Sequence, residues 1–203
     1  MSIEHTKQFF DNHAHNWDSI NRYGKTESDF HDLLSYLDLK DGFKVADLGC
    51  GTGVLVPYIQ GKIGASGTIF AIDISSRMIE ELKKKFTQGN IKAFVMPAEE
   101  LSKIQDTVDA VICFSMFPHV ADKQKLIEES SKVLRPGGKI LIAHFSSRHE
   151  INDFHSKLPK PICNHVLPDL IEMKKMLASA KMELVDYFDG PSEYRLLAKK
   201  IPS

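Results

Sequence analysis

Short apolar runs alternate with amphipathic segments between residues 41 and 144. Runs such as Val108–Phe114 are apolar on both faces, which is typical of a parallel strand covered on both sides. The pattern predicts strands at Lys44–Leu48, Thr68–Ile72, Ala93–Val95, Val108–Phe114 and Gly138–His144, and helices at Val54–Gln60, Ser76–Phe86 and Lys123–Leu134. Because strands alternate with helices, we expect right-handed β-α-β units in one doubly wound α/β sheet.

The segments outside this core follow other patterns. Helical spacing predicts two helices, Ile3–Trp17 and Glu27–Leu39. We expect residues 1–40 to form a helical N-terminal cap. Residues 145–169 are polar and carry three prolines, and a long segment without periodicity is usually functional or mobile. We therefore expect a substrate loop or lid there.

The end of the chain returns to regular patterns. Leu170–Ala180 predicts a helix, and Met182–Phe188 and Glu193–Lys199 predict the two strands of a hairpin. The sequence shows no repeat or linker, so residues 1–203 are expected to form a single domain with its core at 41–144.

The chemistry is concentrated in Val45–Gly53, where an apolar run ends in Asp47 and opens into three glycines at alternate positions. Glycine has no Cβ and tolerates positive φ, so backbone can approach a ligand closely there. The N-terminus of the following helix adds unpaired N–H groups. This arrangement predicts a loop that binds a nucleotide-like cofactor.

Asp73 follows Gly53 by 20 residues, at the end of the second predicted strand. A carboxylate at this place either accepts the ribose hydroxyls of a nucleotide or caps the next helix, and its spacing from the glycines favours the ribose. The glycines do not follow the G-x-G-x-x-G order of dinucleotide sites, which disfavours an oxidoreductase. Asp47 would repel a pyrophosphate but attract an ammonium group, so a cationic nucleoside that carries an amino acid is favoured.

With these motifs the sequence resembles the class I S-adenosylmethionine-dependent methyltransferases. The residues that carry the resemblance are Val45–Gly53, Ala71–Ile74, Met96–Glu99, Val108–His119 and Leu134–Ile142. The resemblance implies a Rossmann-like sheet that is mostly parallel, with an antiparallel C-terminal hairpin strand and N-terminal helices as a lid. It also implies that S-adenosylmethionine is bound by Asp47, Gly49, Cys50, Gly51, Gly53, Asp73, Ile74, Met78, Ala98, Glu99, Phe114 and Ser115.

Within this family the chain is similar to the ubiquinone/menaquinone methyltransferase-like group. Phe9–Asp11 and Trp17–Asn21 resemble the N-terminal signature of that group, whereas His144 stands where those enzymes have an acid. The segment after His144 also lacks the pattern of a quinone pocket, so an acceptor other than a quinone is expected. Candidates for contact with cofactor or acceptor on the lid side are Trp17, Tyr23 and Phe154, which as bulky side chains could equally serve packing.

Histidines are the candidates for the acceptor side. His119 lies just beyond the fourth predicted strand, at the edge where open α/β sheets bind ligands. The ordinary pKa of histidine suits a general base, which methyl transfer needs only if the acceptor arrives protonated. Two interpretations therefore stay open: His119 is a base, with His144 as a second catalytic candidate, or His119 faces solvent at the start of a helix.

A metal site is the second hypothesis for the histidines. His119, His144, His149 and His155, with Cys163 and His165 as additions, could converge on Zn²⁺ or Fe²⁺ and orient the acceptor. The spacing of these histidines is no established metal motif, and scattered histidines usually face solvent.

Composition narrows the substrate class. The 203 residues carry a net charge of −1, which gives no signal for nucleic acid, so a small-molecule acceptor is expected. No apolar run is long enough to cross a membrane, and three widely spaced cysteines favour a reduced, cytoplasmic setting. Methylation of RNA or protein and a non-catalytic cofactor-binding regulator remain alternatives, and the oligomeric state stays open.

Overall fold

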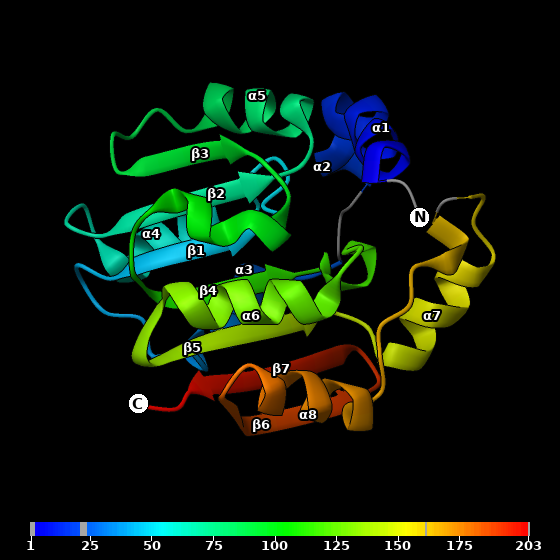
Figure 1. The fold of residues 1–203 in the computed structure, drawn as a ribbon. Coiled ribbons are helices and arrows are strands. Elements are labelled where there is room, and N and C mark those ends of the chain that lie inside the picture. The colour runs from blue at the N-terminus through cyan, green and yellow to red at the C-terminus, as the bar shows by residue number, and fades with distance from the viewer. Residues whose placement is uncertain (1–2, 21–23, 161, 203) are drawn as a thin grey trace.

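A computed structural model describes residues 3–20, 24–160 and 162–202, which form a seven-stranded sheet between two layers of helices (Figure 1). The strands are β1 (Lys44–Leu48), β2 (Thr68–Asp73), β3 (Ile91–Val95), β4 (Val108–Phe114), β5 (Leu134–His144), β6 (Met182–Gly190) and β7 (Glu193–Lys200). The α-helices are α1 (Ile3–His13), α2 (Trp17–Ile20), α3 (Glu27–Ser35), α4 (Val56–Ile63), α5 (Ser76–Lys85), α6 (Lys123–Val133), α7 (Arg148–Ser156) and α8 (Leu170–Ser179). Short 3-10 helices occupy η1 (Ala14–Asn16), η2 (Ala98–Ile104), η3 (Phe117–His119) and η4 (Ile162–Asn164).

The strand order β3-β2-β1-β4-β5-β7-β6 places β1 at the centre of the sheet. β1 pairs in parallel with both β2 and β4, so the order of the strands reverses beside β1. β7 is antiparallel to β5 and to β6. Ligands of open α/β sheets bind outside the carboxyl ends of the strands at such a switch point. The Rossmann-like sheet predicted from the sequence is therefore confirmed, including its antiparallel hairpin strand.

The strands are apolar on both faces because each face has its own core. Side chains alternate along a strand, so Val45 points toward the layer of α3, α4 and α5, while Ala46 points toward the layer of η2, α6 and α8. In β4, Ile112 joins the first core and Val111 the second. This two-sided burial explains the continuous apolar runs in the sequence.

The N-terminal helices lie at the carboxyl edge of the parallel strands (Figure 1). The side chain of Asp11 on α1 accepts hydrogen bonds from Ser75 Oγ at 2.6 Å and from the backbone N–H of Arg77 at 3.3 Å. Asp18 on α2 accepts from Thr52 Oγ1 and forms an ion pair with Lys85. These contacts hold α1 and α2 against the loop after β1 and against α5.

Several predicted boundaries differ from the structure. α4 begins at Val56, because the loop of glycines continues as turns through Leu55. β5 begins at Leu134 instead of Gly138, since Leu134 pairs with Val108 before the register shifts. The residues between Leu134 and Gly138 form an irregularity inside the strand, with Gly137 at φ +75°.

The segment 145–169, expected to be a loop, contains α7. Ser147 and Glu150 form a capping box that starts this helix. Only Ile151 and His155 of α7 are buried, so the helix has no apolar stripe that the sequence pattern could reveal. None of the helices in the described residues combines the length and apolar character that a membrane crossing needs.

Candidate functional site

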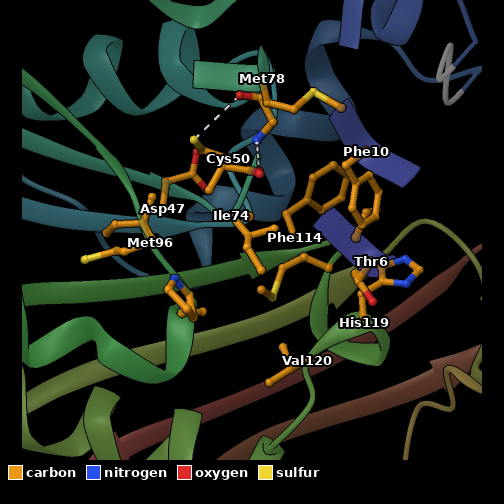
Figure 2. Close-up of a pocket in the computed structure, with 18 of the residues that line it drawn as sticks. Thr6, Phe10, Asp47, Cys50, Ile74, Met78, Met96, Phe114, His119 and Val120 are labelled. Atoms are coloured by element: carbon orange, nitrogen blue, oxygen red, sulfur yellow. Dashed lines mark hydrogen bonds between the residues drawn. The ribbon is translucent and has the colours of Figure 1, made fainter. Parts of the chain in front are cut away.

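A pocket opens at the carboxyl ends of β1, β2 and β4 and is covered by α1 (Figure 2). Its lining combines the loop after β1, the start of α5, the segment after β3 and η3. The lining residues are Ile3, Thr6, Phe10, Trp17, Asp47, Gly49–Thr52, Val54, Leu55, Ile72–Ile74, Met78, Met96–Glu99, Phe114–Met116 and His119–Ala121. The switch point of the sheet thus holds the largest group of predicted site residues.

The glycines of the loop all have positive φ, and a side chain at Gly49 or Gly53 would also clash with a neighbour. Gly49 has φ +63°, and a Cβ there would stand 2.5 Å from Cβ of Met116. Gly51 has φ +53° and packs beneath the indole of Trp17, which would lie 3.4 Å from an added Cβ. Gly53 has φ +92°, packs on Phe86 and lines a neighbouring surface hollow instead of the pocket.

Asp73 anchors the loop to the end of β2. Its Oδ2 accepts a hydrogen bond from the N–H of Gly51 at 2.9 Å, and its Oδ1 accepts one from the N–H of Ser75 at 2.8 Å. Burial raises the pKa of Asp73 to about 6, although both backbone N–H groups act in the opposite direction. Each carboxylate oxygen keeps a further lone pair, so Asp73 can also accept ribose hydroxyls.

Asp47 lies at the end of β1, and one of its carboxyl oxygens lacks a hydrogen-bond partner among the described residues. That oxygen, Oδ2, is buried. Burial first, and the charge of Asp73 second, raise the pKa of Asp47 to about 8. An orphaned carboxylate is costly in a low-dielectric pocket, and a ligand ammonium group would relieve that cost. Asp47 therefore fits the amino-acid portion of S-adenosylmethionine.

Apolar side chains line the pocket between the ends of β2 and β3. Ile74, Met78 and Ala98 contribute here and suit a planar adenine ring. Glu99 is buried, and its Oε1 accepts hydrogen bonds from the backbone N–H groups of Ala121 and Asp122 at 3.1 and 3.2 Å. The carboxylate of Glu99 thus holds the segment after η3 in place. We call the end of the pocket formed by Asp47, Gly49–Thr52, Asp73, Ile74, Met78 and Met96–Glu99 the cofactor half.

Residues of α1 complete the lining of the pocket. Ile3, Thr6 and Phe10 cover it from above, and Phe10 packs edge-to-face on His119 with ring centroids 5.3 Å apart (Figure 2). Sequence reasoning did not select these three residues. The Phe9–Asp11 signature was the signal that could have identified them.

Three histidines meet at the other end of the pocket. Nδ1 of His119 lies 2.7 Å from Nδ1 of His165, and Nδ1 of His155 lies 2.7 Å from the carbonyl oxygen of His165. The ring of His119 is 4.9 Å from each of the other two rings. We call His119, His155 and His165 the histidine half; it joins η3, α7 and the segment after η4.

These histidines are neutral near pH 7. Burial is the main cause that lowers the pKa of His119 well below its usual value, and the neighbouring histidines and Lys123 act in the same direction. Burial also lowers the pKa of His165 to about 4 and lowers that of His155. Lys123 donates to the carbonyl oxygens of Pro118 and Val120, so its ammonium group stays fixed beside η3.

Several predicted candidates lie outside the pocket lining. His144 is buried at the end of β5, with its ring 6.2 Å from that of Tyr194 and with Nε2 lacking a partner among the described residues. His149 is exposed on α7, and Phe154 is 60% exposed. Tyr23 lies outside the described residues.

The hypothesis of a metal site receives no support from the geometry. Across residues 3–20, 24–160 and 162–202, no group of three or more His, Cys, Asp or Glu side chains is arranged to hold a metal ion. His119 and His165 instead contact one another through their ring nitrogens, and His149 is exposed to solvent.

Comparisons with known proteins agree with this geometry. Residues 45–138 match the family model described as a methyltransferase domain. Over 175 residues, which are 73% of this chain and 70% of the relative, the chain is 29% identical to the ubiquinone/menaquinone biosynthesis C-methyltransferase UbiE of Idiomarina loihiensis.

Solved structures share the fold. One chain of a structure described as the complex between the Haloferax volcanii Trm112 methyltransferase activator and the putative methyltransferase superposes with a TM-score of 0.77 at 16% identity, covering 95% of this chain and 98% of that one. A SAM-dependent methyltransferase from Aquifex aeolicus superposes with a TM-score of 0.68 at 21% identity, covering 85% and 90% of the two chains.

Proposed function

The chain is a class I S-adenosylmethionine-dependent methyltransferase, and we propose that it methylates a small-molecule acceptor bound between the cofactor half and the histidine half. The single observation that carries this proposal is the orphaned carboxylate of Asp47 beside the glycine loop. The cofactor half would bind the methyl donor, and the histidine half would face the acceptor.

The residues of the cofactor half have separate tasks. S-adenosylmethionine supplies a methyl group on a positively charged sulfur, which makes that methyl reactive toward a nucleophile. Asp47 would bind the ammonium group, Asp73 the ribose hydroxyls, and Ile74, Met78 and Ala98 the adenine. Phe114 ends β4 and Ser115 follows it; both line the pocket, and we propose that they flank the path of the methyl group.

The chain contributes alignment and exclusion of water. Holding two reactants in line replaces a collision in solution and lowers the barrier by up to roughly 7–11 kcal/mol. Phe10 and Trp17 close the pocket from the N-terminal side, and Asp11 and Asp18 tie their helices to the cofactor half. We therefore propose that α1 and α2 act as the lid over the reacting atoms.

The acceptor is proposed to be small because the histidine half is enclosed. His119 lines the pocket, whereas His155 and His165 are buried behind it. The acceptor would contact His119 and Met116, on the side of the pocket away from Asp73. His144 does not reach the pocket lining and is proposed to stabilise the end of β5 instead of taking part in catalysis.

Two measurements test the proposal. Isothermal calorimetry should show binding of S-adenosylmethionine and of its demethylated product, S-adenosylhomocysteine, and no binding of NAD. Incubation with methyl-labelled S-adenosylmethionine and a fractionated metabolite extract should transfer label to a small, protease-resistant product. Binding of NAD alone would overturn the assignment of the cofactor, and label found only in RNA or protein would overturn that of the acceptor.

A further inference from the structure

The contact between His119 and His165 limits where their protons can lie. A neutral imidazole carries one proton, on either Nδ1 or Nε2. In the 2.7 Å contact between the two Nδ1 atoms, one ring must donate and the other accept. The donor ring then has a bare Nε2, and the acceptor ring carries its proton on Nε2.

The surroundings of the two Nε2 atoms differ. Nε2 of His165 is buried and has no partner in the described part of the chain, whereas His119 lines the pocket. If His165 accepted, its own N–H would be on Nε2 and enclosed without an acceptor, which is unfavourable for a buried polar group. If His165 donates, the N–H lies on Nε2 of His119, where water or a ligand in the pocket can pair with it. Orphaned buried N–H groups are rarer in proteins than under-satisfied acceptors, which favours the second arrangement.

His155 holds His165, the partner of His119, in place. A carbonyl oxygen only accepts, so Nδ1 of His155 must carry its proton and donate it to His165. This bond holds the backbone at His165 and keeps its ring against His119. His155 and His165 are 10 residues apart and lie on α7 and after η4, so the support comes from the segment that the sequence suggested was a loop.

We propose that His119 presents an N–H donor to the acceptor instead of acting as a general base, and that His165 is the positioning residue that fixes this tautomer. The proposal rests on the proposed function, because it assigns the role of a residue in the acceptor site. It is supported by the lowered pKa of His119, since a weakly basic imidazole is a poor proton acceptor near pH 7.

The proposal names a class of acceptor. An N–H donor stabilises a negatively charged atom, so the acceptor should bind as an anion with its charge on oxygen or sulfur, such as a phenolate or a thiolate. The groups whose charge acts on His119 are His155, His165, His144 and Lys123, none of which is negatively charged. Glu99 is the nearby carboxylate, and it is held by the backbone of Ala121 and Asp122.

The balance of atoms is simple. The acceptor loses its proton to solvent before it binds, and its electron pair forms the bond to the methyl carbon. The pair of the broken carbon–sulfur bond stays on sulfur, and His119 keeps its proton throughout. No base is needed inside the pocket.

Nitrogen-15 NMR of histidine-labelled protein saturated with S-adenosylhomocysteine tests the tautomer without any acceptor. We expect His119 to show a protonated Nε2 and a bare Nδ1, and His165 the reverse; spectra of His119→Gln and His165→Asn would assign the signals. A bare Nε2 on His119 would overturn the inference. If S-adenosylhomocysteine failed to bind at all, the proposed function would fail instead, so the two failures are distinguishable.

A second test of the N–H donor measures transfer of the methyl label to acceptors in the metabolite extract. Glutamine can place an amide N–H near the position of Nε2 but cannot take up a proton, whereas leucine offers neither. His119→Gln should stay within about 10-fold of the unmodified rate and His119→Leu should fall about 100-fold, as loss of a hydrogen bond to a charged group predicts. His31→Leu, an exposed histidine on α3, is the matched control and should change nothing. Equal losses in His119→Gln and His119→Leu would contradict the donor role.

Discussion

The two halves of the pocket are built from different kinds of contact. In the cofactor half, carboxylates meet backbone N–H groups, as Asp73 does with Gly51 and Ser75. In the histidine half, side chains meet side chains that are 46 residues apart, as His119 does with His165. Backbone contacts define a general shape for the methyl donor, whereas side-chain contacts can differ from one enzyme to the next. The comparison explains why the donor is easier to assign than the acceptor.

The halves also respond to pH in opposite directions. Burial raises the pKa of Asp47 and Asp73, so their protonated forms are the ones that the folded state favours. Burial lowers the pKa of His119 and His165, which the folded state favours in the neutral form. Acid should therefore weaken the histidine half, and base should weaken the cofactor half while no ligand is bound.

The largest effect is expected from a change in the backbone of the cofactor half. Gly49→Ala would place a side chain at φ +63°, with its Cβ 2.5 Å from Cβ of Met116. Left-handed backbone costs an alanine about 1–2 kcal/mol, and overpacking adds about 1–3 kcal/mol. We expect a loss of about 3 kcal/mol in the free energy of unfolding, measured with urea.

Gly61→Ala is the matched control for this loss. Gly61 lies inside α4, and an added Cβ would meet no atom within 4 Å. Alanine is a better helix former than glycine, so the free energy of unfolding of Gly61→Ala should rise by up to about 1 kcal/mol. Equal stability of the two variants would show that the loop does not require glycine at position 49.

The second effect concerns the affinity for the methyl donor. Asp73→Ala removes the proposed ribose acceptor and leaves the N–H groups of Gly51 and Ser75 without their partner. Hydrogen bonds to a charged group contribute about 1.5–3 kcal/mol each, so the Kd for S-adenosylmethionine should rise at least about 100-fold. Calorimetry measures the Kd, with Asp32→Ala, an exposed residue of α3, as control. An unchanged Kd would mean that Asp73 anchors the loop but does not bind S-adenosylmethionine.

The sequence predicted the cofactor half better than the histidine half, and the two kinds of contact give the reason. Asp47, Gly49 and Gly51 are close in the chain, so their spacing alone indicates a loop after a strand. The contact between His119 and His165 depends on how α7 and η4 pack, and α7 shows no apolar stripe. His144 and His149 are histidines in the same stretch of sequence, yet His144 is buried where β5 pairs with β7 and His149 is exposed. Residue type without packing could not separate them.

A pair of substitutions tests the opposite pH responses. Burial raises the pKa of Asp47 from an ordinary value near 3.8 to about 8, so the folded state keeps a proton that the unfolded state releases. Stability conferred by this proton is present at acidic pH and is lost as pH rises toward 8. Relative to the unmodified protein, the free energy of unfolding of Asp47→Asn should therefore rise by about 2 kcal/mol as pH goes from 4.5 to 6, measured with urea and without ligand.

His144 gives the opposite response. Its pKa falls from 6.5 to about 3 on burial, so the unfolded state takes up a proton that the folded state excludes. The stability that depends on neutral His144 is present above pH 6.5 and is lost as pH falls toward 3. Relative to the unmodified protein, the free energy of unfolding of His144→Leu should rise by about 2 kcal/mol as pH falls from 7 to 4.5. If both variants responded to pH alike, the two environments would not differ as described.

The smallest effect is expected where the lid meets the cofactor half. Lys85 pairs with Asp18 on α2 and donates to the carbonyl oxygen of Thr52 at 3.3 Å, whereas Lys84 pairs with Glu81 on its own helix. Exposed ion pairs contribute about 0–1 kcal/mol, so Lys85→Met and Lys84→Met should both leave the free energy of unfolding within about 1 kcal/mol. Only Lys85→Met loosens the lid, because only Lys85 joins two parts of the molecule. Hydrogen exchange with S-adenosylhomocysteine bound should therefore quicken about twofold in residues 14–20 of Lys85→Met and not of Lys84→Met. Equal exchange in the two variants would mean that the hydrogen bonds of Asp11 with Ser75 and of Asp18 with Thr52 hold the lid closed without Lys85.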